Sequence, residues 1–103
     1  MPRYMVLYRA NPSKWPTDPK QVLAMLERAF EGAAYLFKIG ALKEDGWFTP
    51  QEGYAIFETE SKAKVLELVQ PYFPLYSQDI HEIVSWEDGI QAILAGARAA
   101  ASM

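Results

Sequence analysis

The hydrophobic positions change their spacing along the chain, and these changes predict the order of its strands and helices. Residues 3–9 are an almost unbroken run of aromatic, β-branched and long aliphatic side chains, which is typical of a strand covered on both faces. Alternation along this strand places Tyr4, Val6 and Tyr8 on one face and the residues between them on the other. Both faces therefore need a covering layer.

Three later stretches have apolar residues at the three- and four-residue spacing of amphipathic helices. The first follows an expected N-cap at Asp18 and ends near Gly40, whose access to positive φ suits the end of a helix. The second follows Ser61 and the third follows Ser85, two residues whose hydroxyl groups are good helix caps. The third helix is expected to fade into the alanine-rich C-terminus.

The remaining apolar stretches predict three more strands. Residues 42–48 and 54–58 are expected to pair as a hairpin through the connection 49–53, which contains a proline and a glycine. The Asp-Gly pair at 45–46 is a competing turn that would shorten the first of these strands. A last strand is expected over residues 77–85.

The resulting order is β-α-β-β-α-β followed by a helix, in a single domain over residues 1–103. It predicts an α+β fold of the ferredoxin-like type, with one antiparallel sheet, the first and third strands central, and the helices on one face. The other face would expose an apolar patch that monomers seldom leave in water. The residues expected on that face are Tyr4, Val6, Tyr8, Tyr54 and Ile56. We expect a further layer to cover them.

The composition narrows the classes of partner. Ten basic and thirteen acidic residues give a net charge of −3 without a basic cluster, which disfavours nucleic acid as a partner. The chain has no cysteine and one histidine, so we expect no metal site and no cofactor. No apolar run approaches the ~20 residues of a membrane span, and residues 1–4 suit a strand rather than a signal peptide. We therefore expect a cytoplasmic protein without a membrane partner.

Two stretches carry a family resemblance together with the element order: the strand run Tyr4–Tyr8 and the ending Asp79–Trp86, which reads DIHEIVSW. Over nearly all of residues 3–95 the chain resembles the dimeric α/β-barrel superfamily, especially short stand-alone members such as an uncharacterised family and the muconolactone-isomerase-like proteins. The resemblance implies a homodimer in which two ferredoxin-like sheets pack face to face as a barrel, with the helices outside.

The resemblance is more specific for fold than for activity. The superfamily includes isomerases, cofactor-free monooxygenases, haem enzymes, polyketide cyclases and members without a known reaction, so a shared fold does not assign a reaction. The YCII-like branch is also similar to this chain, but it usually has an early histidine beside an aspartate. Residues 1–80 of this chain contain no histidine.

Three polar residues are candidates for proton-transfer chemistry. His81 is the only imidazole, and alternation places it with Asp79 on one face of the last strand, where the carboxylate would orient it as a general base. Arg9, at the end of the first strand, would hold a carboxylate or an enolate through its guanidinium group. The alternatives are a structural hydrogen bond for His81 and a salt bridge from Arg9 to Glu52 or Glu82.

Five further residues are candidates for ligand binding. Tyr4, Tyr8 and Tyr54 either line a cavity or fill the core and a dimer interface. Trp15, in a loop with two prolines, either closes over a ligand or plugs the end of the barrel. Glu58 shares a face with Tyr54 and either takes part in proton transfer or lies solvated at a strand end.

These features favour a small homodimeric protein that binds an aromatic or otherwise apolar small molecule. If it is an enzyme, we expect an isomerase or cyclase acting by proton transfer, with a cofactor-free monooxygenase as the nearest enzymatic alternative. A different class of function is a non-catalytic dimeric interaction or regulatory module with a filled barrel. No motif identifies the ligand or establishes that a reaction is catalysed.

Overall fold

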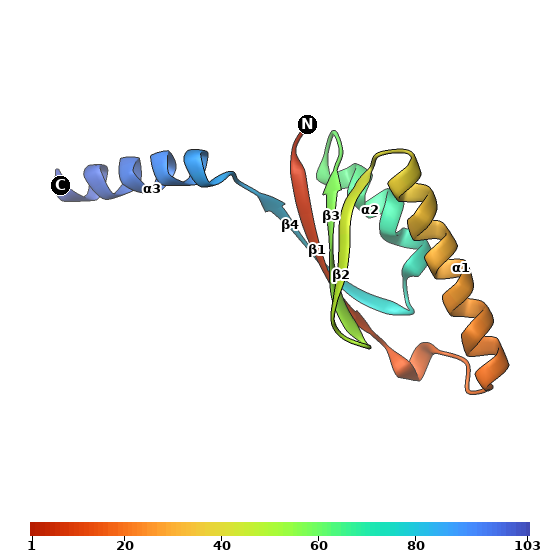
Figure 1. Ribbon diagram of the computed structural model, residues 1–103. Helices are drawn as coiled ribbons and strands as arrows, with labels where there is room; N and C mark the ends of the chain where they lie inside the picture. The colour runs from red at the N-terminus through yellow and green to blue at the C-terminus, as the bar shows by residue number, and fades with distance from the viewer.

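The computed structural model, which describes residues 1–103, contains one four-stranded antiparallel sheet with two helices packed on one of its faces (Figure 1). In chain order the elements are β1 (Arg3–Ala10), α1 (Pro19–Lys38), β2 (Leu42–Thr49), β3 (Glu52–Glu58), α2 (Lys62–Val69), β4 (Tyr76–Ile83) and α3 (Trp86–Ala101). The strand order is β2-β3-β1-β4. The α+β class and the central position of the first and third strands are therefore confirmed, and the order is compatible with a ferredoxin-like fold.

The predicted helix ends are confirmed. The side chains of Asp18, Ser61 and Ser85 each accept a hydrogen bond from a backbone N–H group in the first turn of the helix that follows. These bonds satisfy donors that have no partner inside the helix. Gly40 has a φ of 82° just after α1, a conformation that side chains with a Cβ rarely adopt. None of the helices is long and apolar enough to cross a membrane.

The hairpin between β2 and β3 is tighter than the expected connection over residues 49–53. Strand β2 continues through the Asp-Gly pair at 45–46 and reaches Thr49, so that only Pro50 and Gln51 lie between the strands. The Thr49 hydroxyl accepts hydrogen bonds from the backbone N–H groups of Gln51 and Glu52. Thr49, which was expected in the connection, is therefore the last residue of β2, and its side chain closes the turn.

The expectation that Tyr4, Val6 and Tyr8 face away from the helices is wrong. Tyr4 and Val6 are buried in the core between the sheet and the helices α1 and α2, and Tyr8 packs against that core. The register explains the difference, because β1 aligns Tyr4 with Phe57 and Val6 with Ala55 in β3. These partners also belong to the core.

The uncovered face of the sheet carries the alternate residues of the same strands. Met5 pairs with Ile56 and Leu7 pairs with Tyr54, so two of the five residues expected on this face, Tyr54 and Ile56, do lie there. No helix covers this face in Figure 1, and α3 extends from β4 away from α1 and α2. The radius of gyration is 17.5 Å, whereas a chain of this length in a compact domain has about 13 Å.

One side chain crosses the sheet on the helix-covered face. Tyr8 of β1 reaches over Gly53 of β3 and bonds to Asp45 of β2. A Cβ at Gly53 would lie 2.6 Å from the Tyr8 hydroxyl oxygen and 2.3 Å from the carbonyl oxygen of Gly46. Only a residue without a side chain fits under the Tyr8 ring, so Gly53 fixes the path of Tyr8.

We expect Gly53→Ala to lower the free energy of unfolding by about 1–3 kcal/mol, since the added methyl group overpacks a site that cannot give way. Gly96→Ala is the matched control, because nothing lies within 4 Å of a Cβ at Gly96. This control should be neutral or raise stability by up to about 1 kcal/mol through helix propensity. Urea unfolding of both variants measures the difference. Equal midpoints would show that Tyr8 is not held across Gly53.

Candidate functional site

An apolar cavity of about 90 Å³ lies between α1 and the helix-covered face of the sheet. Thirteen of the 15 residues that line it are hydrophobic. Its walls come from Ala29, Ala33 and Leu36 of α1 and from Val6, Ala55 and Phe57 of the sheet. Sites that bind small molecules combine such walls with a few polar groups that converge at one place.

The polar end of this cavity is formed by Tyr8 and Asp45. The Tyr8 hydroxyl lies 2.6 Å from Asp45 Oδ1 and 3.1 Å from the carbonyl oxygen of Gly46. A carboxylate accepts up to about four hydrogen bonds, so Asp45 keeps capacity for a donor on a bound molecule. Gln78 and Tyr76 of β4 line the same cavity.

The electrostatics give these two groups different roles. Burial, followed by the hydrogen bond to Asp45, raises the pKa of Tyr8 far above its ordinary value, so its hydroxyl remains a proton donor. Desolvation also raises the pKa of Asp45, and the hydrogen bonds from Tyr8 and from the Gly46 backbone act in the opposite direction. Asp45 keeps contact with solvent although aromatic rings cover part of it. It is therefore the group of the pair that can take up a proton.

A row of aromatic rings holds the Tyr8 side chain in place. Its members, in spatial order, are Trp15, Tyr76, Tyr8, Trp47 and Phe30, and neighbouring rings meet edge to face at centroid distances of 5.8 to 6.1 Å. Edge-to-face pairs contribute about 0.5–1.5 kcal/mol each beyond the area that they bury. This aromatic row runs from the loop after β1 to α1 and packs against the Tyr8 ring from two sides, through Tyr76 and Trp47.

The mouth of the cavity lies between α1 and the edge strand β2. Phe30 of α1 is 50% exposed and Trp47 of β2 is 52% exposed, although both line the cavity. The cavity volume of about 90 Å³ is below the ~150 Å³ that encloses a benzene ring in a protein. A ring-sized molecule therefore enters only when these two side chains move outward or when part of it stays in the mouth.

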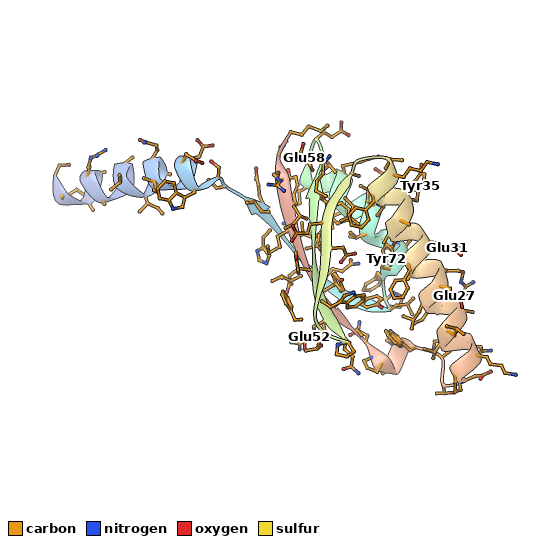
Figure 2. All side chains as sticks on the ribbon, viewed as in Figure 1. Glu27, Glu31, Tyr35, Glu52, Glu58 and Tyr72 are labelled. Atoms are coloured by element: carbon orange, nitrogen blue, oxygen red, sulfur yellow. The ribbon has the colours of Figure 1, made fainter.

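Tyr72 separates this cavity from a wider groove of about 620 Å³ between α1 and α2. Figure 2 shows Tyr72 between the sheet and α1, and its hydroxyl donates to the carbonyl oxygen of Ala29 at 3.3 Å. Glu31 and Tyr35 lie along the same helix. The groove is open to solvent and has no pair of hydrogen-bonded polar side chains comparable to Tyr8 and Asp45, so the apolar cavity is the better candidate site.

The residues expected to carry proton transfer lie on the other face of the sheet. His81 pairs with Met5 and Asp79 pairs with Leu7, both on the uncovered face. Arg9 forms a salt bridge to Glu52 with an Nη2 to Oε2 distance of 3.5 Å, which was one of its two expected alternatives. Arg9 and the residue opposite His81 are four positions apart along β1, about 13 Å. The structure does not bring Arg9 and His81 together.

The expected ligand-binding residues are also divided between the two faces. Tyr8 lines the cavity, whereas Tyr4 belongs to the core beyond it. Tyr54, on the uncovered face, donates to Glu44 and stacks on Phe48. Of the five residues expected to bind a ligand, only Tyr8 lines the cavity.

Trp15 and Glu58 have structural contacts. The indole Nε1 of Trp15 donates to the carbonyl oxygen of Leu75 at 2.9 Å, which fixes the loop after β1 to the start of β4. Glu58 pairs with Arg3 at 3.8 Å, at the opposite end of β3 from Glu52 (Figure 2). Neither residue lines the cavity.

Asp45 and Trp47 line the cavity but were not among the residues expected to form a site. Asp45 stands before a glycine, where a turn competes with the strand, and Trp47 follows two positions later. The alternation of Leu42, Asp45 and Trp47 on the helix-covered face also depends on an irregularity in the β2 register after Leu42. Such a bulge changes which residues share a face and leaves little signal in a hydrophobic pattern.

Comparison with protein-family models and with curated proteins finds no match. In the structure no group of three or more His, Asp or Glu side chains is close enough together to hold a metal ion. The site is therefore described by its own geometry, an apolar cavity that ends in a tyrosine and aspartate pair.

The raised pKa of Asp45 predicts the sign of a pH effect on stability. The Asp45 carboxyl group has a pKa of 3.8 in the unfolded chain and a higher pKa in the folded chain. The folded state therefore loses stability as the pH rises from the unfolded pKa through the folded pKa. Asp45→Asn keeps an acceptor for Tyr8 and removes the charge. At neutral pH this variant should be more stable than the original chain, by less than about 1 kcal/mol because Asp45 keeps solvent contact.

The measurement is urea unfolding of both chains between neutral and acidic pH. The advantage of Asp45→Asn should shrink below the unfolded pKa, where both chains are neutral at this position. An advantage that appears only at acidic pH would mean that folding lowers the pKa of Asp45, contrary to the desolvation argument.

Proposed function

We propose that this chain is a small homodimeric α/β-barrel protein that binds an aromatic or otherwise apolar small molecule in the cavity and acts on it by proton transfer. The observation that carries this proposal is the Tyr8 and Asp45 pair at the end of an apolar cavity. Asp45 is the proton acceptor, and Tyr8 orients it by donating to Oδ1. These two residues replace His81 and Asp79 in the proposed chemistry.

The site favours a neutral ligand that carries a carbonyl or a hydroxyl group. A carboxylate on the ligand would face the carboxylate of Asp45 among apolar walls, where like charges repel strongly. A carbonyl compound with an acidic neighbouring C–H bond offers a proton to Asp45. Such proton abstraction is the chemistry of the isomerases and cyclases expected from the sequence.

Proton transfer is tested by exchange of the α protons of an aryl methyl ketone in deuterated water, followed by NMR. The protein should accelerate exchange over buffer, and Asp45→Asn should reduce the protein-catalysed rate by at least about 100-fold, the lower range for loss of a general base. His81→Ala is the control and should retain the rate, because His81 lies on the other face of the sheet.

Two outcomes would contradict parts of this assignment. An exchange rate that depends on His81 and not on Asp45 would place the proton transfer on the uncovered face of the sheet. A ligand-induced rise in melting temperature without exchange would leave binding in place and remove proton transfer.

The dimer is supported by the surface that the single chain exposes. The chain has an accessible surface of 7364 Å², whereas a folded monomer of 11.7 kDa has about 5,900 Å². The excess of about 1,500 Å², which includes the surface of the protruding helix α3, is larger than the ~800 Å² that each partner contributes to a standard interface. The uncovered sheet face, with the half-buried side chains of Met5, Leu7 and Tyr54, is the proposed contact, and two such faces together form the barrel.

A second candidate function, a dimeric interaction module without chemistry, is supported by the small size of the cavity. Its volume of about 90 Å³ lies below the ~300 Å³ at which ordinary ligand pockets begin. In this alternative the hydrogen bond between Tyr8 and Asp45 only links β1 to β2, and the dimer face alone has a function. The exchange and binding measurements described above distinguish the two candidates.

The dimer contact is tested with two matched substitutions. Leu7→Asp places a charge on the uncovered sheet face and should raise the dimer dissociation constant by at least about 100-fold, since a charge buried without a partner is costly. Leu66→Asp, at a position 53% exposed on α2, should leave the constant unchanged. Sedimentation equilibrium measures both. Equal dissociation constants for the two variants would place the contact elsewhere.

A further inference from the structure

Tyr76 is a buried tyrosine whose hydroxyl group has no partner within the chain. It is the first residue of β4, and only 7% of it is exposed. Its hydroxyl forms no hydrogen bond with another group of the protein, unlike the hydroxyls of Tyr8 and Tyr72. Folded proteins pair nearly all of their buried polar groups, so an unpaired one is a candidate for binding or catalysis.

The Tyr76 hydroxyl borders the apolar cavity, because Tyr76 is one of the residues that line it. Every fully buried side-chain oxygen of this chain has a hydrogen-bond partner, so the unpaired hydroxyl of Tyr76 reaches open space. Burial, followed by the negative charge of Asp45, raises the pKa of Tyr76. The hydroxyl therefore keeps its proton at neutral pH and lies within electrostatic range of Asp45.

Asp45 and Tyr76 reach the cavity from opposite edges of the sheet. The strand order β2-β3-β1-β4 places Asp45 on one edge strand and Tyr76 on the other (Figure 1). Tyr8 lies between them on β1, and its ring meets that of Tyr76 edge to face at 5.8 Å. The cavity therefore has a proton acceptor on one side of Tyr8 and an unpaired O–H donor on the other.

The position of Tyr76 is fixed by the loop after β1 as well as by the sheet. The ring of Trp15 meets that of Tyr76 at 5.8 Å, and the Trp15 indole donates to the carbonyl oxygen of Leu75, the residue before Tyr76. The Tyr76 backbone pairs with Ala10 of β1. A donor that is held in place before a ligand arrives needs no reorganisation when charge develops next to it.

The other polar side chains of the cavity are less suited to this role. Gln78 already donates from Nε2 to the carbonyl oxygen of Val69 at 3.1 Å. Trp47, at the mouth, is 52% exposed, and a hydrogen bond is weaker where water competes for it. Tyr76 is the hydroxyl that is both buried and unpaired.

We propose that Tyr76 donates a hydrogen bond to the carbonyl oxygen of the bound ligand. This inference rests on the proposed function and deepens it, because it narrows the ligand class to compounds with a carbonyl group beside a C–H bond that faces Asp45. When Asp45 takes the proton, the electron pair of the C–H bond moves toward the carbonyl group, and Tyr76 stabilises the charge that forms on oxygen. Return of a proton from Asp45 to the carbon restores the ketone, so exchange needs no other reagent.

Two ligands of the same shape test this contact in the full-length protein. Acetophenone has the carbonyl oxygen, and α-methylstyrene has a methylene group in its place. Dissociation constants for both are measured with the unmodified chain, with Tyr76→Phe and with Tyr4→Phe. Tyr4→Phe is the matched control, because Tyr4 is buried in the core but does not line the cavity. Infrared spectroscopy of bound acetophenone with an isotope-labelled carbonyl group measures the carbonyl stretching frequency.

We expect Tyr76→Phe to weaken acetophenone binding by about 2- to 10-fold, the effect of one neutral hydrogen bond. Binding of α-methylstyrene should be unchanged, which also shows that the variant is folded. The carbonyl band should move to higher frequency, since a hydrogen bond to the carbonyl oxygen lowers it. Proton exchange should slow by at least about 100-fold, the lower range for loss of an oxyanion donor. Tyr4→Phe should change none of these quantities.

The outcomes separate this inference from the proposed function. Equal loss of affinity for both ligands in Tyr76→Phe, or an unchanged carbonyl band, would overturn the role of Tyr76 and leave ketone binding and proton transfer standing. Failure of the unmodified chain to bind acetophenone would overturn both. Ketone binding that depends on Tyr76 without proton exchange would support the hydrogen bond and overturn proton transfer alone.

Discussion

Helices cover only one of the two faces of this sheet, and much of the structure depends on that asymmetry. Tyr4 and Val6 are buried against the helices, while Met5 and Leu7, the residues next to them in β1, lie on a face that no element covers. A strand with large apolar side chains on both faces needs two covering layers. The helices α1 and α2 are one layer, and a second copy of the sheet is the layer that we propose for the other face.

The helix-covered face also positions the candidate site. Tyr8 belongs to the same alternating set as Tyr4 and Val6, but it is only half-buried and packs against the margin of the core. The absence of a side chain at Gly53 lets the Tyr8 ring cross β3 and donate to Asp45. One tyrosine therefore links the central strand, the edge strand and the cavity, so that the core and the proposed chemistry share a residue.

Features that depend on local physics could be predicted from the sequence. Helix starts at Asp18, Ser61 and Ser85 follow from side chains that satisfy the backbone donors of the first turn, and the structure contains all three. The order of strands and the central position of β1 follow from short connections and the rules for crossovers. The stop after α1 at Gly40 follows from the conformational freedom of glycine.

Features that depend on the register between strands could not be predicted from the sequence. Alternation states which residues of β1 share a face, but the choice between the faces comes from pairing with β3, and a bulge in β2 shifts the side chains again. For this reason Tyr8 was expected on the same face as Tyr54, from which the structure separates it, and Asp45 was not among the expected site residues. Titratable groups are chosen for chemistry by their neighbours in space, which a hydrophobic pattern does not give.

In the proposed dimer, a second copy of the chain completes the half-covered sheet. Sedimentation equilibrium of the unmodified protein at micromolar concentration tests it most directly, because mass is measured without reference to shape. We expect the mass of two chains. A mass of 11.7 kDa, the value for one chain, would contradict it.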